Sequence, residues 1–536
     1  MFFENFEFVE LKYFTILLLP ILIIISPSIA TTDVDIIHRL TQFDTNDVQF
    51  GSRFSNLNLE IRSLETWSTG RHCVLTKMED LTLETYNEIT KKAGGLIIQL
   101  PKMFNNLSTD TMETIYQIEQ NMLSSSVKIP VYFSPHNENL DQIISDINVK
   151  ASGASNSNVK SSAISDLMLL ISSNGYQAIT SGSDHTPNKK AKLPIIQGEL
   201  VPSKNNKNSE PTRLSTIVIT ASINPFRISN HVSFNPDAAL LLILIDFFSK
   251  LYSNKKTTPN HKIIFLLSES GSLLNFQGTK KWLDDNQVQD VDFVMCLDTI
   301  IQPTNLEDEN SLYMHVSKPP KEGTVLNSFY KLFKETGEHN NKTIEGVHKK
   351  INLAEPHLAW EHERFGIKKI TSFTLSTVKN YKSNARNTIF TRNQGDLMNS
   401  LQSNAEVIIQ TLTKLIFDVN DERLSSSISK VSKKTVESWI GIKSTLQNND
   451  VKNAFERYLR NVKVTFEKPD YRDPDFMLYN GAEAQLNIYN VKPAIFDLFL
   501  TILIASYLCV FYFVLNYFPN IYNIFKNDVG STKISY

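Results

Sequence analysis

Strongly apolar residues are concentrated in two segments of the chain, and the first lies close to the N-terminus. Residues 14–25 read FTILLLPILIII, which is the length of the apolar core of a signal peptide and is short for a membrane span. Ser28 and Ala30 follow as the small residues that a cleavage site needs. We therefore expect a signal peptide at residues 1–30. An uncleaved anchor is the alternative, because glutamate outnumbers lysine before the apolar core.

The second apolar segment, residues 498–518, reads LFLTILIASYLCVFYFVLNYF and contains no charge. A helix of this length is ~31 Å long, which matches the hydrocarbon core of a bilayer. A buried core helix is the alternative, but such helices rarely run this far without a charge. We predict a transmembrane helix at 494–518. A signal that starts translocation makes this helix a stop-transfer element, with residues 31–493 in the lumen and a cytosolic tail at 519–536.

Between these segments, short apolar runs alternate with helical patterns. Residues 31–150 contain three such runs bounded by Gly and Pro, at 72–78, 94–100 and 129–135. Helical stretches at 83–92 and 111–123 separate them, which predicts a small α/β unit with a partly parallel sheet. Residues 32–64 look helical and polar. The Ser-, Asn- and Lys-rich residues 151–213 predict a loop-rich connection with short strands.

The main core begins at residue 214. Its strands are near-continuous apolar runs, as expected when both faces of a sheet are covered, at 214–222, 262–270, 291–299 and 311–317. Helices are expected at 237–252, 278–286 and 401–417. We predict a mixed central sheet flanked by helices over 214–420, followed by a separate juxtamembrane stalk at 421–493. Within the stalk, prolines require residues 468–480 to be extended rather than helical.

Composition limits the classes of function. The 536 residues are too many for one ordinary core, and 41% hydrophobic with 21% charged residues is a globular balance. The net charge is −2, and basic residues form no stripe along the sequence, so we expect no nucleic-acid partner. The chain contains only three cysteines, Cys73, Cys296 and Cys509. A Cys73–Cys296 disulfide is one alternative, but the apolar strand around Cys296 favours a free, buried thiol.

The residues alone identify no catalytic motif. GSLLNFQGTK (271–280) has the wrong spacing for a phosphate-binding loop, and SESGS (268–272) lacks the first glycine of a nucleophile elbow. HLAWEHERF (357–365) is not the HExxH arrangement that places two zinc-binding histidines on one helix face.

Four longer stretches carry a family resemblance. They are NFQGTKKWLDDN (275–286), HVSKPPKEGT (315–324), INLAEPHLAWEHERFGIKK (351–369) and YNVKPAIFDL (489–498). Through them the chain resembles the nicastrin/nicalin branch of the zinc aminopeptidase-like, transferrin-receptor-like superfamily over nearly its whole length. The resemblance implies an aminopeptidase-like core.

In active members of this superfamily, two zinc ions share a bridging carboxylate, and a further Glu acts as the general base. The position of the His-x-Asp zinc motif reads Ser222-Ile223-Asn224 here, and the Glu-Glu pair reads Ser268-Glu269. The loop that supplies the bridging Asp has no convincing counterpart, although Asp237 is a weak candidate. The resemblance thus implies that ligands are lost at Ser222 and Asn224, and the base at Ser268.

Three ligand positions match the family: Glu269, Asp298 and His362. Without the bridging ligand and the base they cannot run a two-metal mechanism. We expect a pseudo-peptidase with no catalytic residue, no bound metal and no cofactor. Structural roles can explain their retention: Glu269 capping a turn, Asp298 binding backbone amides, and His362 donating to either one.

The resemblance also implies a location and partners. Nicalin-like proteins of this branch reside in the endoplasmic reticulum membrane, with the Nodal modulator protein (NOMO) as a lumenal partner and a small polytopic membrane protein as a second partner. Their complex joins the ribosome-bound translocon during biogenesis of multi-pass membrane proteins, which implies a scaffold or chaperone-like subunit. A nicastrin-like substrate receptor is one alternative, although such ectodomains are larger and cysteine-rich. An active lumenal metallopeptidase is the other, and the lost ligands argue against it.

Two kinds of surface residue complete the predictions. Asn106 and Asn341 are the only Asn-x-Ser/Thr acceptors, and both lie in the predicted lumenal part. Asp497 lies at the lumenal edge of the span, where a charge is costly unless it faces water, headgroups or a basic partner. Ser506 belongs to a small-residue face that lets another helix approach. We predict that Asp497 and Ser506 contact the polytopic partner; the alternative is that Asp497 only sits among headgroups.

Overall fold

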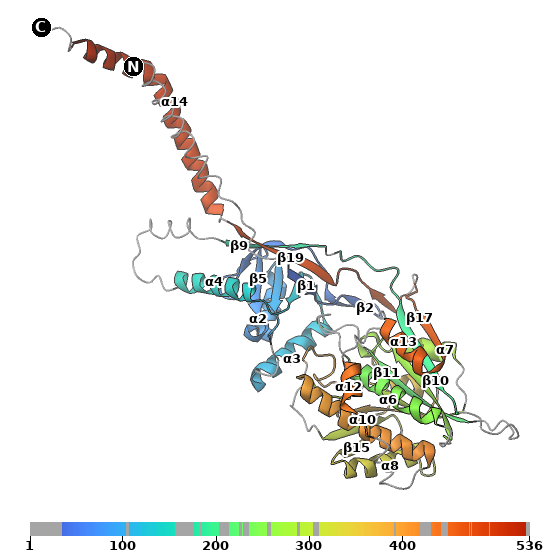
Figure 1. The fold of residues 1–536 in the computed structure, drawn as a ribbon. Coiled ribbons are helices and arrows are strands. Elements are labelled where there is room, and N and C mark those ends of the chain that lie inside the picture. The colour runs from blue at the N-terminus through green and yellow to red at the C-terminus, as the bar shows by residue number, and fades with distance from the viewer. Residues whose placement is uncertain are drawn as a thin grey trace.

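The computed structural model describes residues 35–102, 107–155, 175–182, 184–202, 214–223, 228, 235–254, 259–286, 290–303, 310–390, 393–418, 430–440, 449–470, 472, 474–491 and 494–531. The predicted signal peptide, Asn106 and Asn224 lie outside these residues. Figure 1 shows a smaller unit and a larger unit, with a long helix that projects from the smaller one.

The larger unit is built on an eight-stranded mixed sheet. Its strands, in spatial order, are β15 (Thr343–His348), β14 (Ser311–Val316), β16 (Ser372–Ser376), β13 (Val291–Leu297), β11 (Ser215–Ser222), β12 (His261–Ser268), β10 (Leu193–Leu200) and β17 (Arg460–Glu467). Strands β12, β11, β13 and β16 run parallel in the middle. Of these, β11, β12 and β13 are the near-continuous apolar runs expected of a sheet covered on both faces.

Helices cover both faces of this sheet. The largest apolar cluster joins one face to α6 (Pro236–Ser253), α8 (Val325–His339), α10 (Gln394–Phe417), α12 (Lys433–Ile440) and α13 (Asn449–Tyr458). On the other face, η3 (Ser272–Leu274) leads into α7 (Gln277–Asp285), which packs with α9 (His362–Ile367) around Trp282 and Phe365. The α6 helix starts sharply, because the Asn235 side chain accepts a 3.0 Å hydrogen bond from the Ala238 amide and Pro236 follows the cap.

The smaller unit is a closed barrel. Its strands, in order around the barrel, are β1 (Asp35–Arg39), β19 (Glu483–Val491), β9 (Gly175–Ser181), β4 (Asn58–Arg62), β5 (His72–Lys77), β6 (Gly95–Gln99) and β8 (Val131–Ser134). Strands β4, β5, β6 and β8 are parallel. The connecting helices are η1 (Met78–Asp80), α2 (Leu83–Lys92), α3 (Thr109–Ser124) and α4 (Glu138–Ser155). A four-stranded sheet contains β18 (Phe476–Leu478), β2 (Phe43–Thr45), β3 (Val48–Ser52) and β7 (Ser126–Val127).

Two expectations differ from the structure. The described part of residues 32–64 forms strands β1 to β4 rather than polar helix. Residues from the expected separate stalk at 421–493 instead join both units, because β17 pairs with β10 and β19 pairs with β1 and β9. These pairings link residues far apart in sequence, so no local sequence pattern predicts them. The other domain boundaries stay predictions.

The cysteines are all free, and the alternative of a Cys73–Cys296 disulfide is wrong. Cys73 is buried in β5 of the barrel, whereas Cys296 is buried in β13 of the large sheet. Burial raises the pKa of both thiols, so both stay protonated.

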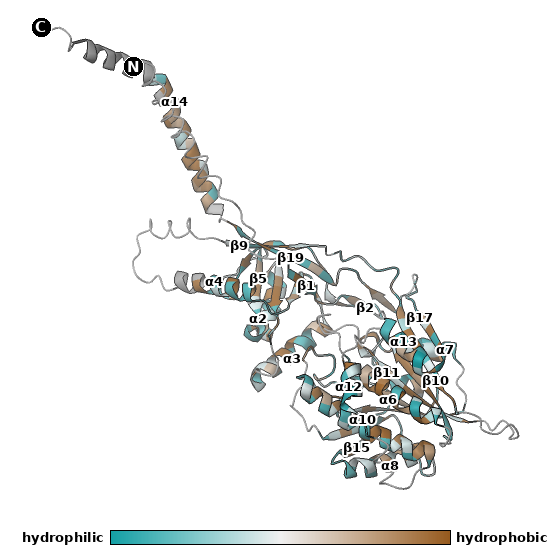
Figure 2. Ribbon diagram, viewed as in Figure 1, coloured by the Kyte–Doolittle hydropathy of each residue, from teal (hydrophilic) through white to brown (hydrophobic). Residues whose placement is uncertain are grey.

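The helix that projects from the barrel is α14 (Ala494–Ser531). Within the described residues, its segment Phe496–Tyr517 is the one helix long and apolar enough to cross a membrane, with a mean hydropathy of 2.5 and none of it buried against the protein. Figure 2 shows this apolar character along its first half. The predicted fold class is therefore confirmed: a helix-flanked mixed sheet, a smaller N-terminal α/β unit and one C-terminal apolar helix.

Candidate functional site

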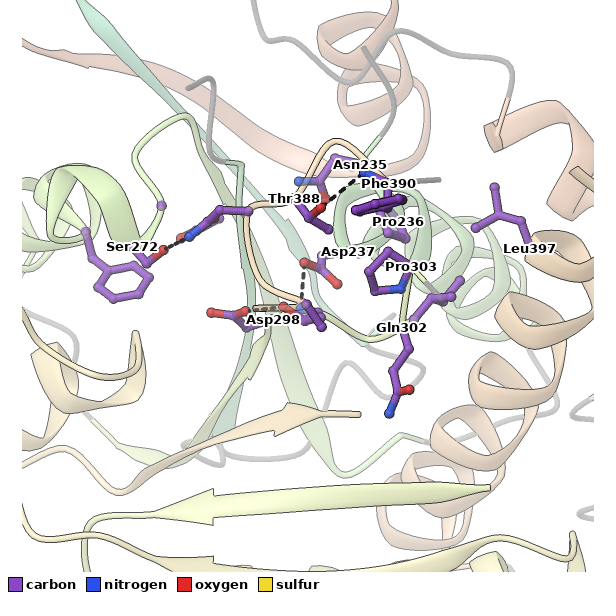
Figure 3. Close-up of a pocket in the computed structure, with 17 residues that line it drawn as sticks. Asn235, Pro236, Asp237, Ser272, Asp298, Gln302, Pro303, Thr388, Phe390 and Leu397 are labelled. Atoms are coloured by element: carbon purple, nitrogen blue, oxygen red, sulfur yellow. Dashed lines mark hydrogen bonds between the residues drawn. The ribbon is translucent and has the colours of Figure 1, made fainter. Parts of the chain in front are cut away.

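A small pocket lies where the parallel strands of the large sheet end. Ser222 ends β11, Ser268 ends β12 and Asp298 directly follows β13. Ligands commonly bind at this end of such sheets. The pocket has a volume of about 80 Å³, and its lining includes Ser222, Asp237 and Asp298 (Figure 3). The structure thus brings several of the sequence-predicted positions to one place.

Asp298 is bound to an arginine that the sequence analysis did not single out. The Arg386 guanidinium donates from Nε to Oδ1 over 3.1 Å and from Nη2 to Oδ2 over 2.5 Å. The Thr299 hydroxyl adds a 2.8 Å hydrogen bond to Oδ1. Such a bidentate fork is among the stronger charge-assisted contacts in proteins. Both carboxylate oxygens of Asp298 therefore already face a cation.

The Arg386 side chain is fixed on its remaining sides and is only 6% exposed. Its Nη1 donates to the carbonyl oxygens of Ala359 (3.0 Å) and Tyr381 (2.9 Å). Its guanidinium lies 4.3 Å from the centre of the Trp360 ring, in a cation–π contact. The arginine is therefore an integral part of the folded site.

Behind Trp360 lies a buried histidine. The His315 ring stacks on Trp360 with 4.1 Å between the ring centres, and its Nε2 donates to the Val378 carbonyl over 2.9 Å. Burial, with Arg386 nearby, lowers the pKa of His315 to about 4. The ring is therefore neutral at neutral pH and supports the stack without adding a second positive charge.

Asp237, the weak candidate for the bridging ligand, binds backbone amides. Its carboxylate accepts hydrogen bonds from the amides of Thr299 (2.9 Å) and Ile300 (2.8 Å), in the turn after β13. From the sequence, this role was expected of Asp298. The structure assigns it to Asp237, in the first turn of α6, and pairs Asp298 with Arg386 instead.

Glu269 and His362 do not line the pocket. Glu269 is buried directly after β12, where its amide donates to the Pro194 carbonyl over 3.1 Å. His362 begins α9, and its Nδ1 lies 2.9 Å from the Thr374 hydroxyl, while Nε2 has no hydrogen-bond partner. Burial lowers the pKa of His362 to about 3. Across the described residues, no three His, Cys, Asp or Glu side chains gather as metal ligands. This arrangement does not fit a zinc pair.

Two of the positions at which the resemblance implies a lost group lie side by side. Ser222 and Ser268 are register partners on β11 and β12. The Ser268 hydroxyl lies 2.7 Å from that of Ser270, which accepts a 2.7 Å hydrogen bond from the Gly278 amide. A Cβ atom at Gly278 would lie only 2.1 Å from the Ser268 Oγ. The space around residue 268 is therefore filled, with no room for a glutamate side chain.

A further buried carboxylate that was not predicted, Glu361, immediately precedes His362. Glu361 is fully buried, and its Oε1 accepts hydrogen bonds from the hydroxyls of Thr279 (2.6 Å) and Thr220 (3.1 Å). The Ser222 hydroxyl lies nearby but forms no hydrogen bond of good geometry. Burial raises the pKa of Glu361 to about 7. Its position beside the family-matched His362 was the only signal in the sequence.

No family model matches the chain. The BOS complex subunit ncln of Danio rerio is 32% identical over 542 residues, which cover 91% of each protein. The BOS complex subunit NCLN of Homo sapiens is 30% identical over 557 residues, covering 97% of this chain and 96% of the human protein. The chain belongs to the nicalin family. A Caenorhabditis elegans protein named Nicalin is 25% identical over 532 residues, covering 90% of each.

Solved structures give weaker likenesses. The match to a zinc aminopeptidase from Bacillus subtilis covers 73% of this nicalin-family chain and 87% of the aminopeptidase, at 11% identity and a TM-score of 0.32. The match to the LapA aminopeptidase of Legionella pneumophila covers 50% of this chain and 63% of LapA, at 12% identity and a TM-score of 0.28. The family assignment rests on the sequence relatives alone.

The remaining predicted residues of this nicalin-family chain lie on the surface or outside the described residues. Asn341 is exposed in the turn between α8 and β15, whereas Asn106 is not described. Asp497 and Ser506 are both exposed on α14. The Thr501 hydroxyl donates to the Asp497 carbonyl, and the Ser506 hydroxyl donates to the Leu503 carbonyl. Glycosylation and partner contact at these positions stay predictions.

Proposed function

We propose that this chain is a non-enzymatic scaffold or chaperone-like subunit of an endoplasmic reticulum membrane complex. Its partners are a NOMO-like lumenal protein and a small polytopic membrane protein, and the assembly joins the translocon during multi-pass membrane protein biogenesis. Relatives that align with more than nine-tenths of the chain are named BOS complex subunits, which supports membership of a complex. The family resemblance supplies the identity of the partners.

The Arg386–Asp298 fork carries the non-enzymatic part of this proposal. A co-catalytic metal needs carboxylate lone pairs that are free to coordinate it, and it must keep an open position for water. Here a buried guanidinium faces both oxygens of Asp298, and Asp237 is engaged by two backbone amides. With Ser268 in place of the base, this chain is a pseudo-peptidase that has kept the peptidase framework for another purpose.

Helix α14 supports the membrane location. Its apolar segment is exposed along its length, which suits contact with lipid and with neighbouring helices rather than with this chain's own core. Asp497 and Ser506 lie on this exposed helix, and they are the residues through which we propose contact with the polytopic partner. The larger lumenal partner binds the folded units. Exposure of Asn341 is consistent with a lumenal glycoprotein.

Affinity purification of the tagged full-length chain from membranes in mild detergent tests this function. We expect both partners to co-purify in stoichiometric amounts. Replacing residues 495–518 with an unrelated single-pass span should remove the polytopic partner and keep the lumenal one. A milder variant, Asp497→Asn, removes one charge and keeps the helix intact. It should weaken the contact with the polytopic partner and leave the contact with the lumenal partner unchanged. Purification of the chain without any stoichiometric partner would contradict the proposal.

A further inference from the structure

The apolar helix is joined to the barrel almost directly. Strand β19 ends at Val491 and α14 begins at Ala494, so only two residues separate them. Three Cα–Cα steps span at most about 11 Å. The first residue of the apolar segment, Phe496, follows within the first turn of α14. A bilayer around this segment therefore lies close to the end of the barrel from which α14 leaves.

The strand that carries this connection is held along both edges. It pairs with β9 from Gln485 to Val491, and with β1 from Glu483 to Leu486. The hydrogen-bonded part of β19 therefore reaches its last residue and leaves no free strand that could act as a longer tether. The barrel and α14 are connected by a short link rather than by the separate stalk expected from the sequence.

The strand pairings identify the residues at this end of the barrel. Val491 lies opposite Gly175 at the start of β9, and Tyr176 lies opposite Ile61 at the end of β4. Strands β5, β6 and β8 run parallel to β4 in succession. The turns that follow these parallel strands therefore lie at the end from which α14 leaves. One of them is η1, in which Glu79 and Asp80 are exposed.

We infer that this end of the barrel, with η1 as its marker, lies against the lipid headgroups of the membrane that α14 crosses. The large unit is then held away from the bilayer. Figure 1 supports this arrangement, because α14 leaves beside β9 and β19, while α8 and β15 lie at the far end of the molecule. The inference rests on the membrane placement in the proposed function and adds which surface faces the lipid.

The charges at this end indicate what holds it there. Lys77 is paired with Asp141 at 2.7 Å, and Arg62 with Glu60 at 2.7 Å. The exposed residues of η1 are acidic, as is exposed Glu138 after β8, whereas Lys102 after β6 is an exposed cation. A surface with this balance has little attraction for anionic lipid, which recruits clusters of unpaired Lys and Arg. The short link to α14 therefore fixes the contact, and the lipid's charge does not.

Energy transfer in nanodiscs tests the inference. The full-length chain with Cys509→Ser, whose remaining cysteines Cys73 and Cys296 are buried, receives a donor dye at Glu79→Cys or at Glu338→Cys. Glu338 is the matched control, an exposed glutamate on α8. With acceptor dye on lipid headgroups, we expect severalfold higher transfer from position 79 than from 338, unchanged when phosphatidylserine is added to phosphatidylcholine. Equal or reversed transfer would overturn the inference, as would a requirement for phosphatidylserine.

A linker variant tests whether the short link to α14 is what holds this end of the barrel against the headgroups. A 20-residue Gly/Ser insertion between Val491 and the next residue adds a tether with a root-mean-square length of roughly 25 Å. It should bring the transfer from position 79 down toward that from 338. Unchanged transfer would contradict the role of the short link. Failure of the chain to elute with the nanodiscs would instead contradict the membrane placement in the proposed function.

Discussion

Glu119 on α3 accepts a 2.6 Å hydrogen bond from the hydroxyl of Thr388, 269 residues away, and both residues are buried. The same carboxylate accepts a 2.9 Å bond from the Ile389 amide. Next to them, Tyr116 of α3 packs against Phe390 with 4.8 Å between the ring centres. The segment that contains these residues also carries Arg386, which binds Asp298. One loop therefore joins the smaller unit to the pocket that Asp298 lines.

This loop gives a test of how the two units are coupled. Glu119→Ala should destabilise the fold by about 2 kcal/mol, because it leaves the Thr388 hydroxyl and the Ile389 amide buried without their acceptor. Glu113→Ala, an exposed glutamate on the same helix, should change stability by less than about 0.5 kcal/mol. Urea unfolding of both variants provides the comparison. Equal effects would show that the Glu119 contact does not hold the loop.

Arg386 should be energetically linked to that contact. In a double-mutant cycle of Glu119→Ala with Arg386→Met, we expect a coupling of at least about 0.5 kcal/mol, since both residues hold the same short loop. Simple additivity in the unfolding free energies would mean that the loop is anchored independently at its two ends.

Placing a glutamate at position 268, where the resemblance expects the catalytic base, should fail for a steric reason. The Ser268 hydroxyl is packed against the Cα of Gly278, so Ser268→Glu forces a larger charged side chain into filled space. We expect a loss of about 3 kcal/mol or more and no gain of peptidase activity. Ser268→Ala, which removes only the contact with Ser270, should cost about 1 kcal/mol. A Ser268→Glu variant of normal stability would contradict this account of the packing.

Acid should weaken the fold through the buried histidines. The folded pKa values of His315 (about 4) and His362 (about 3) lie below the ordinary 6.5. The unfolded chain therefore binds these protons first, and each ring removes about 1.4 kcal/mol per pH unit as pH falls below 6.5. Glu361 acts in the opposite direction. Its folded pKa of about 7 exceeds the ordinary 4.5, so its contribution grows as pH falls from 7 to 4.5.

The slope of stability against pH distinguishes these groups. Removing the opposing group in Glu361→Gln should steepen the loss between pH 6.5 and 4.5 by about 1.4 kcal/mol per unit. His362→Gln should make it shallower by the same amount. Groups common to all three proteins cancel in this comparison, which urea unfolding at several pH values provides. Parallel slopes would contradict the protonation states assigned to the buried site.

The parts of the fold that could be predicted are those whose signal is local. The apolar runs that became β5, β6 and β11 to β14 are recognisable because strands buried on both faces are near-continuously apolar. Strands β17 and β19 are half-exposed and pair with residues far away in the sequence. Their partners are set by tertiary packing, so from the sequence these segments were assigned only to a separate stalk.

The site shows the same limit. Matching of family positions found Ser222, Ser268 and Asp298, because each lies at the end of a predicted strand. Arg386 could not be found in this way, since it lies in a polar loop and its partner is 88 residues away. The exchange of roles between Asp237 and Asp298 also depends on which carboxylate points toward the turn after β13. Only three-dimensional packing decides that direction.

The most direct test of the central claim is metal analysis of the full-length chain, purified in mild detergent without chelator and dialysed against micromolar zinc. Because Asp298 is held by Arg386, and Glu269 and His362 do not line the pocket, we expect no stoichiometric zinc, and the same result for His362→Ala. One or two zinc ions per chain, lost in His362→Ala, would contradict it.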